Sequence, residues 1–223
     1  MQNLAKIKEQ FKSPDLFDQA LTHRSWVNEN KNIRNTNERL EFLGDAVLEF
    51  VVSDYLYKNF EDKEEGYLTA LRANLVNTQN LASVAQSLEV GKFLFLSKGE
   101  DEGGGRENQS LLADTVEAII GVIYLELGLK KATEFINENI LKDVNDKLKS
   151  PLKDPKSLLQ EKVQAQGNGT PKYKVVKEIG PDHAKKFVVE VYVANKSIAE
   201  GIGKSKSIAE QEAAKVALGH ISG

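Results

Sequence analysis

Three acidic residues stand in a segment that is otherwise mostly apolar. The segment runs from Asn37 to Leu48, and its acids are Glu38, Glu41 and Asp45. On a helix that turns by about 100° per residue, spacings of three and four place these carboxylates within roughly 60° of one another. Apolar residues occupy most of the remaining circumference, which is typical of a buried helix. Buried carboxylates are costly unless a cation meets them. Because no Lys or His shares their stripe, a divalent metal is the simplest cation to expect.

A second segment has the same character. Between Ser110 and Tyr124 the surrounding residues are again apolar, and Asp114 and Glu117 share one helical face. Two buried helices of this kind can bring carboxylates from both to one point. An all-oxygen site without Cys or His suits Mg²⁺, with Mn²⁺ as a substitute.

Small residues accompany both acid stripes. Gly44 lies beside the first stripe and Gly121 continues the second. Glycine lets another backbone, or a ligand, come close, and both possibilities stay open. Ser110 follows the Gly103-Gly104-Gly105 run and is predicted to cap the second acidic helix.

The run from Glu38 to Leu48 resembles the signature of the ribonuclease III family, the double-stranded-RNA endonucleases. Asp114-Thr-Val-Glu117-Ala resembles that family's second acidic motif. Ala20-Leu-Thr-His-Arg-Ser-Trp26 resembles its N-terminal Ala-Leu-Thr-His motif, with Trp26 where Tyr is more usual. The resemblance covers essentially the whole chain.

The resemblance implies a metal-dependent hydrolase. Its catalytic and metal-binding positions fall on Glu41, Asp45, Asp114 and Glu117. One Mg²⁺ would activate a water and a second would stabilise the departing 3′ oxygen. Two subunits would form one RNA-binding valley, cut both strands and leave 5′-phosphates, 3′-hydroxyls and short 3′ overhangs. Expected substrates are ribosomal RNA precursors, some mRNAs and tRNA precursors, with no small-molecule substrate.

Four further residues of this part have two readings each. Glu38 either binds metal directly or supports the site through an ion pair with Arg39 or Arg72. Glu65 either faces the catalytic valley, as the family position does, or belongs to an ordinary loop. His23 is a possible metal ligand, but a hydrogen-bonded structural role is favoured. Phe42 is expected to make a homodimer contact, with core packing as the alternative.

The pattern changes after Pro155. A predicted helix over Pro155 to Gln166 is followed by predicted strands at 173–179, 187–193 and 197–203. Ser207-Ile-Ala-Glu210 then resembles a capping box, which predicts a second helix that ends at Leu218. The α-β-β-β-α order resembles a double-stranded-RNA-binding domain. So do Leu158-Leu-Gln-Glu161, Gly180-Pro-Asp-His183 and Gly203-Lys-Ser-Lys206.

By that resemblance, six residues of the C-terminal domain would contact RNA. Minor-groove positions would be Gln160, Glu161, Gln164 and His183, and phosphate positions would be Lys204 and Lys206. The family's common Lys-Lys-x-Ala-Lys run reads Lys206-Ser-Ile-Ala-Glu210 here, which predicts weaker phosphate contact unless Lys204 and Lys185 compensate. Solvated surface is the alternative for the charged positions.

The elements that position these residues divide the chain in two. Helical periodicity recurs over 16–21, 39–60, 67–88, 111–127 and 132–148. An all-α nuclease domain is therefore predicted at 1–148, a proline-containing linker at 149–154 and the RNA-binding domain at 155–223. Of the net charge of −3, residues 1–150 carry −7 and residues 151–223 carry +4. An acidic part that gathers cations beside a basic part that meets phosphate explains this split, although ordinary surface variation would also produce it.

Composition limits both the expected cellular location of the protein and the alternative functions. The chain has no Cys, and it lacks a signal-peptide pattern and any run of about 18 apolar residues, so a cytoplasmic protein without membrane contact is expected. A di-iron helical bundle would need Glu-x-x-His pairs, and the three His provide none. A catalytically inactive double-stranded-RNA-binding protein would be expected to lack the acids, and all four are present.

Overall fold

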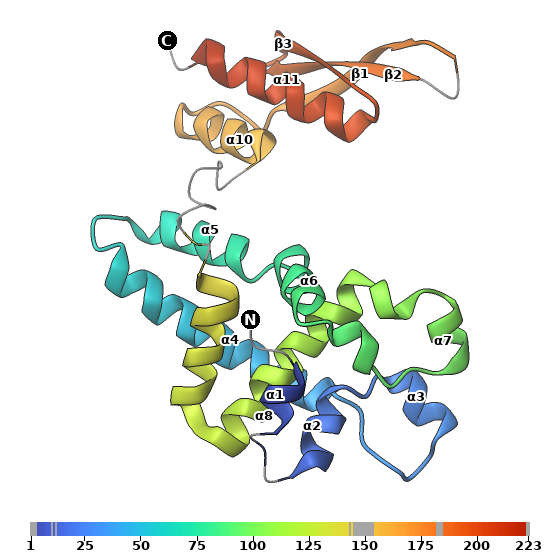
Figure 1. The fold of residues 1–223 in the computed structure, drawn as a ribbon. Helices are drawn as coiled ribbons and strands as arrows, with labels where there is room; N and C mark the ends of the chain where they lie inside the picture. Colours follow the sequence, from blue (N-terminus) through green and yellow to red (C-terminus); the bar gives the residue numbers. More distant parts are fainter. Residues whose placement is uncertain are drawn as a thin grey trace. The chain divides into compact units, whose positions relative to one another are not determined.

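The computed structural model describes residues 4–9, 11, 13–142, 144, 154–181 and 185–221. The chain divides into two compact units, Met1–Ser150 and Pro151–Gly223 (Figure 1). The predicted linker falls mostly outside the described residues, except for Asp154, which caps the first helix of the second unit. Across the described residues, no helix is long and apolar enough to cross a membrane.

The first unit is helical, as the periodicity predicts. Its α-helices are α1 (Leu4–Lys8), α2 (Pro14–Ala20), α3 (Arg24–Glu29), α4 (Glu38–Asn59), α5 (Glu65–Leu75), α6 (Thr78–Ser87), α7 (Lys98–Glu102) and α8 (Gln109–Ile136). Short 3₁₀ turns η1 (Val90–Phe93) and η2 (Gly105–Glu107) flank α7, and a π-helical turn, η3 (Asn137–Leu141), follows α8.

The two acid-bearing helices, α4 and α8, pack directly on each other through glycine. A Cβ on Gly44 would overlap the carbonyl oxygen of Glu117, and a Cβ on Gly121 would overlap that of Leu40. The glycines beside the acid stripes therefore admit a neighbouring backbone, which decides between the two possibilities that the sequence left open. This contact fixes the separation of the two acid-bearing helices.

Two local predictions for this unit are corrected, and a third, the helix break before residue 132, is confirmed. The periodic stretch 67–88 is two helices, because Asn77 adopts an extended conformation and caps α6 through the backbone N–H of Asn80. Helix α8 begins one residue before Ser110, and its cap is Asn108, whose side chain accepts hydrogen bonds from Ser110 N and Leu111 N. The predicted break before residue 132 is a sharp turn at Gly128, where φ is 83°. Part of the predicted helix 132–148 lies outside the described residues.

The N-terminal motif connects three segments. The backbone of Leu21 and His23 pairs with Phe95, and Thr22 O accepts a hydrogen bond of 2.9 Å from Asn37 N, at the start of α4. Trp26 packs against the Phe95 ring at a centroid distance of 5.6 Å. The motif therefore places the first turn of α4 relative to His23.

The second unit has the predicted α-β-β-β-α order. It consists of α10 (Pro155–Ala165), β1 (Lys172–Ile179), β2 (Lys186–Val193), β3 (Lys196–Gly203) and α11 (Lys206–Ile221). The strands form an antiparallel sheet in the order β1-β2-β3, with Val175 opposite Val189 and Val191 opposite Ala199.

The core of the second unit lies between its helices and one face of the sheet. Leu159, Val163 and Val191 pack with a run of buried alanines on α11. Gly201 and Gly203 permit this close packing, because a Cβ on either would overlap the backbone of α11.

The predicted capping box at Ser207 is wrong. Helix α11 begins at Lys206, and the hydroxyl of Ser205 accepts a hydrogen bond from Ile208 N instead. Glu210 turns to α10 and forms an ion pair of 2.5 Å with Lys156. The acid at this position therefore holds the two helices together.

Candidate active site

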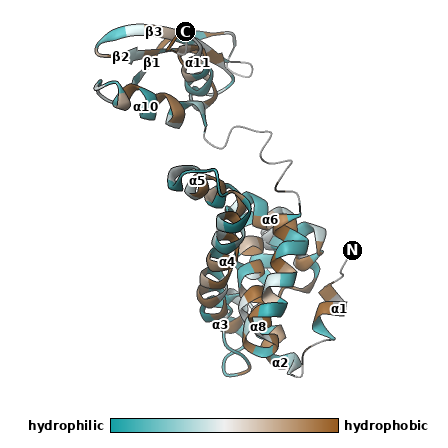
Figure 2. Cartoon of the chain, turned by 90° about the vertical axis from the view of Figure 1, so that its left-hand side faces the viewer, coloured by the Kyte–Doolittle hydropathy of each residue, from teal (hydrophilic) through white to brown (hydrophobic). Residues whose placement is uncertain are grey.

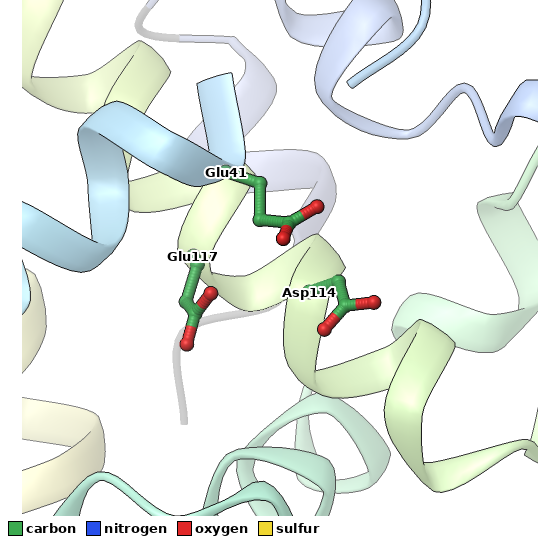
Figure 3. Close-up of side chains that lie close together, drawn as sticks. All are labelled: Glu41, Asp114 and Glu117. Carbon is green, nitrogen blue, oxygen red and sulfur yellow. The ribbon is translucent and has the colours of Figure 1, made fainter. Parts of the chain in front are cut away.

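Glu41, Asp114 and Glu117 converge on one point. Each offers a carboxylate oxygen, and these oxygens lie within 4.8 Å of one another. Figure 3 shows Glu41 on α4, with Asp114 and Glu117 one helical turn apart on α8. All three residues are partly buried, and none of them forms an ion pair with a described Lys or Arg. We call these three residues the carboxylate cluster.

Asp45, the fourth predicted acid, lies outside this cluster. It sits one turn beyond Glu41 on α4 and is exposed to solvent. It is still close enough for its negative charge to raise the pKa of both Glu41 and Glu117. Its direct contact with a metal stays a prediction.

Burial and mutual repulsion disfavour ionised acids in the cluster. Burial, followed by the charges of Asp45, Asp114, Glu41 and Glu49, raises the pKa of Glu117 to about 8. The pKa of Glu41 is raised by burial and by neighbouring acids. Burial also raises the pKa of Asp114, while the facing His23 opposes that rise. A cation bound between these oxygens would relieve both effects, so the donor set fits a hard divalent ion.

The neighbouring acids Glu38, Glu49 and Glu65 have partners outside the cluster. Glu38 accepts a hydrogen bond of 3.0 Å from Thr36 and lies 3.9 Å from Arg24, rather than pairing with Arg39 or Arg72. Arg72 instead pairs with Glu49 at 2.7 Å. Glu65 begins α5 and accepts a hydrogen bond from Thr69.

A cavity of about 490 Å³ opens beside the cluster. Its lining includes Glu38, Glu41, Asp114, His23, Arg24 and Asn37, together with Leu94, Leu96, Leu111 and Thr115. Arg24 and Asn37 were not singled out from the sequence, although Arg24 lies within the N-terminal motif and Asn37 directly precedes the run from Glu38 to Leu48. His23 has the hydrogen-bonded structural role that the sequence favoured. Its Nδ1 lies 2.8 Å from the Ser25 hydroxyl, and its side chain caps α3.

The predicted RNA-contacting residues lie on the surface of the second unit. Gln160, Glu161 and Gln164 are exposed on α10, opposite the buried Leu159 and Val163. Exposed Lys204 and Lys206 stand where β3 leads into α11. Lys185 pairs with Glu178 at 3.0 Å, and His183 lies outside the described residues.

The face of α4 that carries Phe42 is open. Phe42 is 80% exposed, and Phe50 and Tyr57 on the same helix are 58% and 75% exposed. These aromatic residues fall within roughly 80° of arc, so they form one stripe. Apolar and polar residues alternate along α4 (Figure 2). The helix is thus less completely buried within one chain than its composition suggests, and plain core packing of Phe42 is wrong.

Comparison with known proteins finds a separate family match for each unit. Residues 13–144 match a family described as ribonuclease-III-like, and residues 155–221 match the double-stranded RNA binding motif. A ribonuclease 3 of Natranaerobius thermophilus is 46% identical over 207 residues, which cover 93% of this chain and 90% of that protein. This chain belongs to the ribonuclease III family. A ribonuclease 3 of Caldanaerobacter subterraneus subsp. tengcongensis is 45% identical and covers 97% and 95% of the respective chains.

A solved structure supports the helical fold of the first unit. The nuclease domain of ribonuclease III from Campylobacter jejuni is 44% identical, with a TM-score of 0.57, and the match covers 64% of this chain and 97% of that one. A second structure of that domain, with a TM-score of 0.56, is described as having structural flexibility in the region involved in dimer formation. The predicted family and the predicted two-domain fold class are confirmed. As a member of the ribonuclease III family, the chain is an endoribonuclease.

Proposed function

We propose that this chain is a Mg²⁺-dependent hydrolase of double-stranded RNA whose cleavage centre is the carboxylate cluster. The observation that carries the proposal is the convergence of three carboxylates within 4.8 Å, with no described Lys or Arg to neutralise them. The fused unit matches a double-stranded RNA binding motif, which supports a duplex as substrate. Mn²⁺ is expected to substitute for Mg²⁺, since both prefer oxygen ligands.

The residues have distinct parts in this mechanism. Glu41, Asp114 and Glu117 would hold the metal, and the glycine contact between α4 and α8 would keep their oxygens in place. Asp45 is exposed and adds negative charge near the cluster. Its carboxylate would join the metal ligands when RNA and metal are bound. Mg²⁺ held by these residues would supply a water of lowered pKa, whose hydroxide form is the nucleophile toward phosphorus, and would offset the charge of the phosphate. Breaking the bond to the 3′ oxygen leaves a 5′-phosphate and a 3′-hydroxyl.

We further propose that the active enzyme is a homodimer. The exposed aromatic stripe of α4 is a surface that a second copy would cover, and a dimer-forming region is named for the related nuclease domain of Campylobacter jejuni. Two offset sites in such a dimer would cut opposite strands and leave short 3′ overhangs. Glu38 and Glu65 would support the site, and processing of ribosomal RNA precursors and some mRNAs is the expected role.

The test compares duplex and single-stranded RNA of the same sequence, with Mg²⁺ or with EDTA. We expect cleavage of the duplex in Mg²⁺ only. Glu117→Gln keeps the size of the side chain but removes its charge, so cleavage should collapse while gel-shift affinity for the duplex holds within a few-fold. Equal cleavage of both RNAs, or full activity in EDTA, would refute the proposal. Wild-type binding without any cleavage would favour the catalytically inactive alternative.

A further inference from the structure

The cavity beside the carboxylate cluster has hydrogen-bond donors as well as acids in its lining. The acids Glu41 and Asp114 come from α4 and α8, whereas His23 and Arg24 come from the start of α3. An RNA strand that reaches the cluster brings several phosphates, and the metal site serves only the one being cut. A neighbouring phosphate in this cavity would need donors to offset the nearby carboxylates.

The hydrogen bonds of His23 orient its ring. Ser97 N donates to the Ser25 hydroxyl at 3.0 Å, and this hydroxyl lies 2.8 Å from His23 Nδ1. Ser25 N also approaches the same nitrogen at 3.3 Å. Nδ1 is therefore an acceptor, and the neutral ring carries its hydrogen on Nε2. No described residue accepts a hydrogen bond from Nε2, which leaves it available as a donor at the cavity.

Arg24 is weakly held. Its guanidinium lies 3.9 Å from Glu38, and both side chains are more than half exposed. Exposed ion pairs of this kind contribute little, so Arg24 can exchange Glu38 for a phosphate without a large loss. The fork of donors on Arg also fits the oxygens of a phosphate better than a single ammonium would.

We propose that His23 and Arg24 form a phosphate-binding subsite for the strand being cut, beside the carboxylate cluster. His23 Nε2–H donates to a phosphate oxygen, and Arg24 supplies the neutralising charge. This subsite rests on the proposed function, because it takes the carboxylate cluster as the cleavage centre. His23 is a positioning residue in this arrangement and binds no metal.

Two substitutions separate the helix-capping role of His23 from its role as a hydrogen-bond donor. His23→Asn keeps an excellent helix cap, since Asn ends about where Nδ1 lies, but it cannot reach as far as Nε2. His23→Gln reaches that far with an amide N–H, but it loses the cap. In single-turnover cleavage of a duplex with Mg²⁺, we expect His23→Asn to lower the saturated rate by about 10- to 100-fold with a wild-type Tm. His23→Gln should retain most of the rate with a lower Tm.

If His23→Gln cleaves more slowly than His23→Asn, the assignment of His23 is overturned. A wild-type rate for His23→Asn would show that His23 serves only as a cap. A loss of Mn²⁺ affinity in His23→Asn, measured by calorimetry on the RNA-free protein, would make His23 a metal ligand instead. If the wild-type chain fails to cleave duplex RNA in Mg²⁺, the proposed function fails, and the subsite falls with it.

The control for Arg24 is Lys98, which forms a similarly exposed pair with Glu102 at 3.8 Å and does not line the cavity. Arg24→Gln should raise the protein concentration that gives half-maximal cleavage by several-fold. It should also flatten the salt dependence by about 0.9 in logarithmic slope, the value expected for one lost phosphate contact. Lys98→Gln should match wild type in both measurements. Equal effects of the two substitutions would mean that Arg24 acts only through net charge.

Discussion

Removing the negative charge of Glu117 should stabilise the metal-free protein at high pH. Glu117 ionises near 4.5 in the unfolded chain, whereas burial and neighbouring acids raise its pKa to about 8 in the folded chain. Between these values the folded state binds more protons than the unfolded state, so the free energy of unfolding falls as the pH rises. Below 4.5 this penalty is absent, and above 8 it is complete. Gln has no charge at any pH and removes the penalty.

The size of the effect follows from the two pKa values. Their difference corresponds to at most roughly 5 kcal/mol. Glu117 is only partly buried, and solvent screens much of the repulsion, so we take about 1–2 kcal/mol as the expected gain for Glu117→Gln at pH 8. For a unit of this size, that gain raises Tm by about 2–8 °C. At pH 5 the gain should be close to zero.

Thermal unfolding of the full chain in EDTA, measured at pH 5 and pH 8, tests this prediction. Glu65→Gln is the matched control, because Glu65 is exposed and lies outside the carboxylate cluster. Added Mg²⁺ at pH 8 should raise Tm more in wild type than in Glu117→Gln, since the variant has lost a ligand. A lower Tm for Glu117→Gln at both pH values would refute the electrostatic account and make Glu117 a packing residue.

Three further predictions address the helix contact, the dimer and the RNA surface. Gly44→Ala should cost about 1–3 kcal/mol of stability because its Cβ meets backbone, whereas Gly66→Ala, with open space around it, should be neutral or stabilising in thermal unfolding. Phe42→Asp should give monomers in sedimentation and reduce cleavage, while Ile33→Asp, also exposed but off α4, should sediment like wild type; a wild-type monomer at micromolar concentration would contradict the dimer. Replacing Lys204 and Lys206 by Gln should weaken duplex binding and reduce its logarithmic salt slope by about 0.9 per lost contact, and an unchanged slope would mean that neither lysine touches phosphate.

The sequence alone was sufficient to predict the two acid stripes and the fold of each unit. Spacings of three and four encode one helical face, and the predicted strands at 173–179 and 187–193 alternate in sequence, so these features depend on local geometry. Family membership followed from the same segments, since Glu38 to Leu48 and Asp114 to Glu117 are contiguous motifs.

Caps and long-range partners were harder to predict. Ser110 and Ser207 are good cap residues by type, but Asn108 and Ser205 hold the backbone N–H groups at the helix starts. A sequence offers several competent caps within two residues, and the direction in which the chain enters the helix selects one of them. Glu210 looked like a lost phosphate contact, yet it pairs with Lys156, which is far away in the sequence.

Only the tertiary structure decided which acids meet. Helical spacing puts Glu41 and Asp45 on one stripe, but the crossing of α4 and α8 at Gly44 and Gly121 brings Glu41 to Asp114 and Glu117, and leaves Asp45 exposed. The position of that crossing depends on which side chains are small enough to let two backbones touch, and on the segment that ties Thr22 to Asn37. The sequence by itself therefore determined the chemistry available to the site, and packing between distant segments determined its geometry.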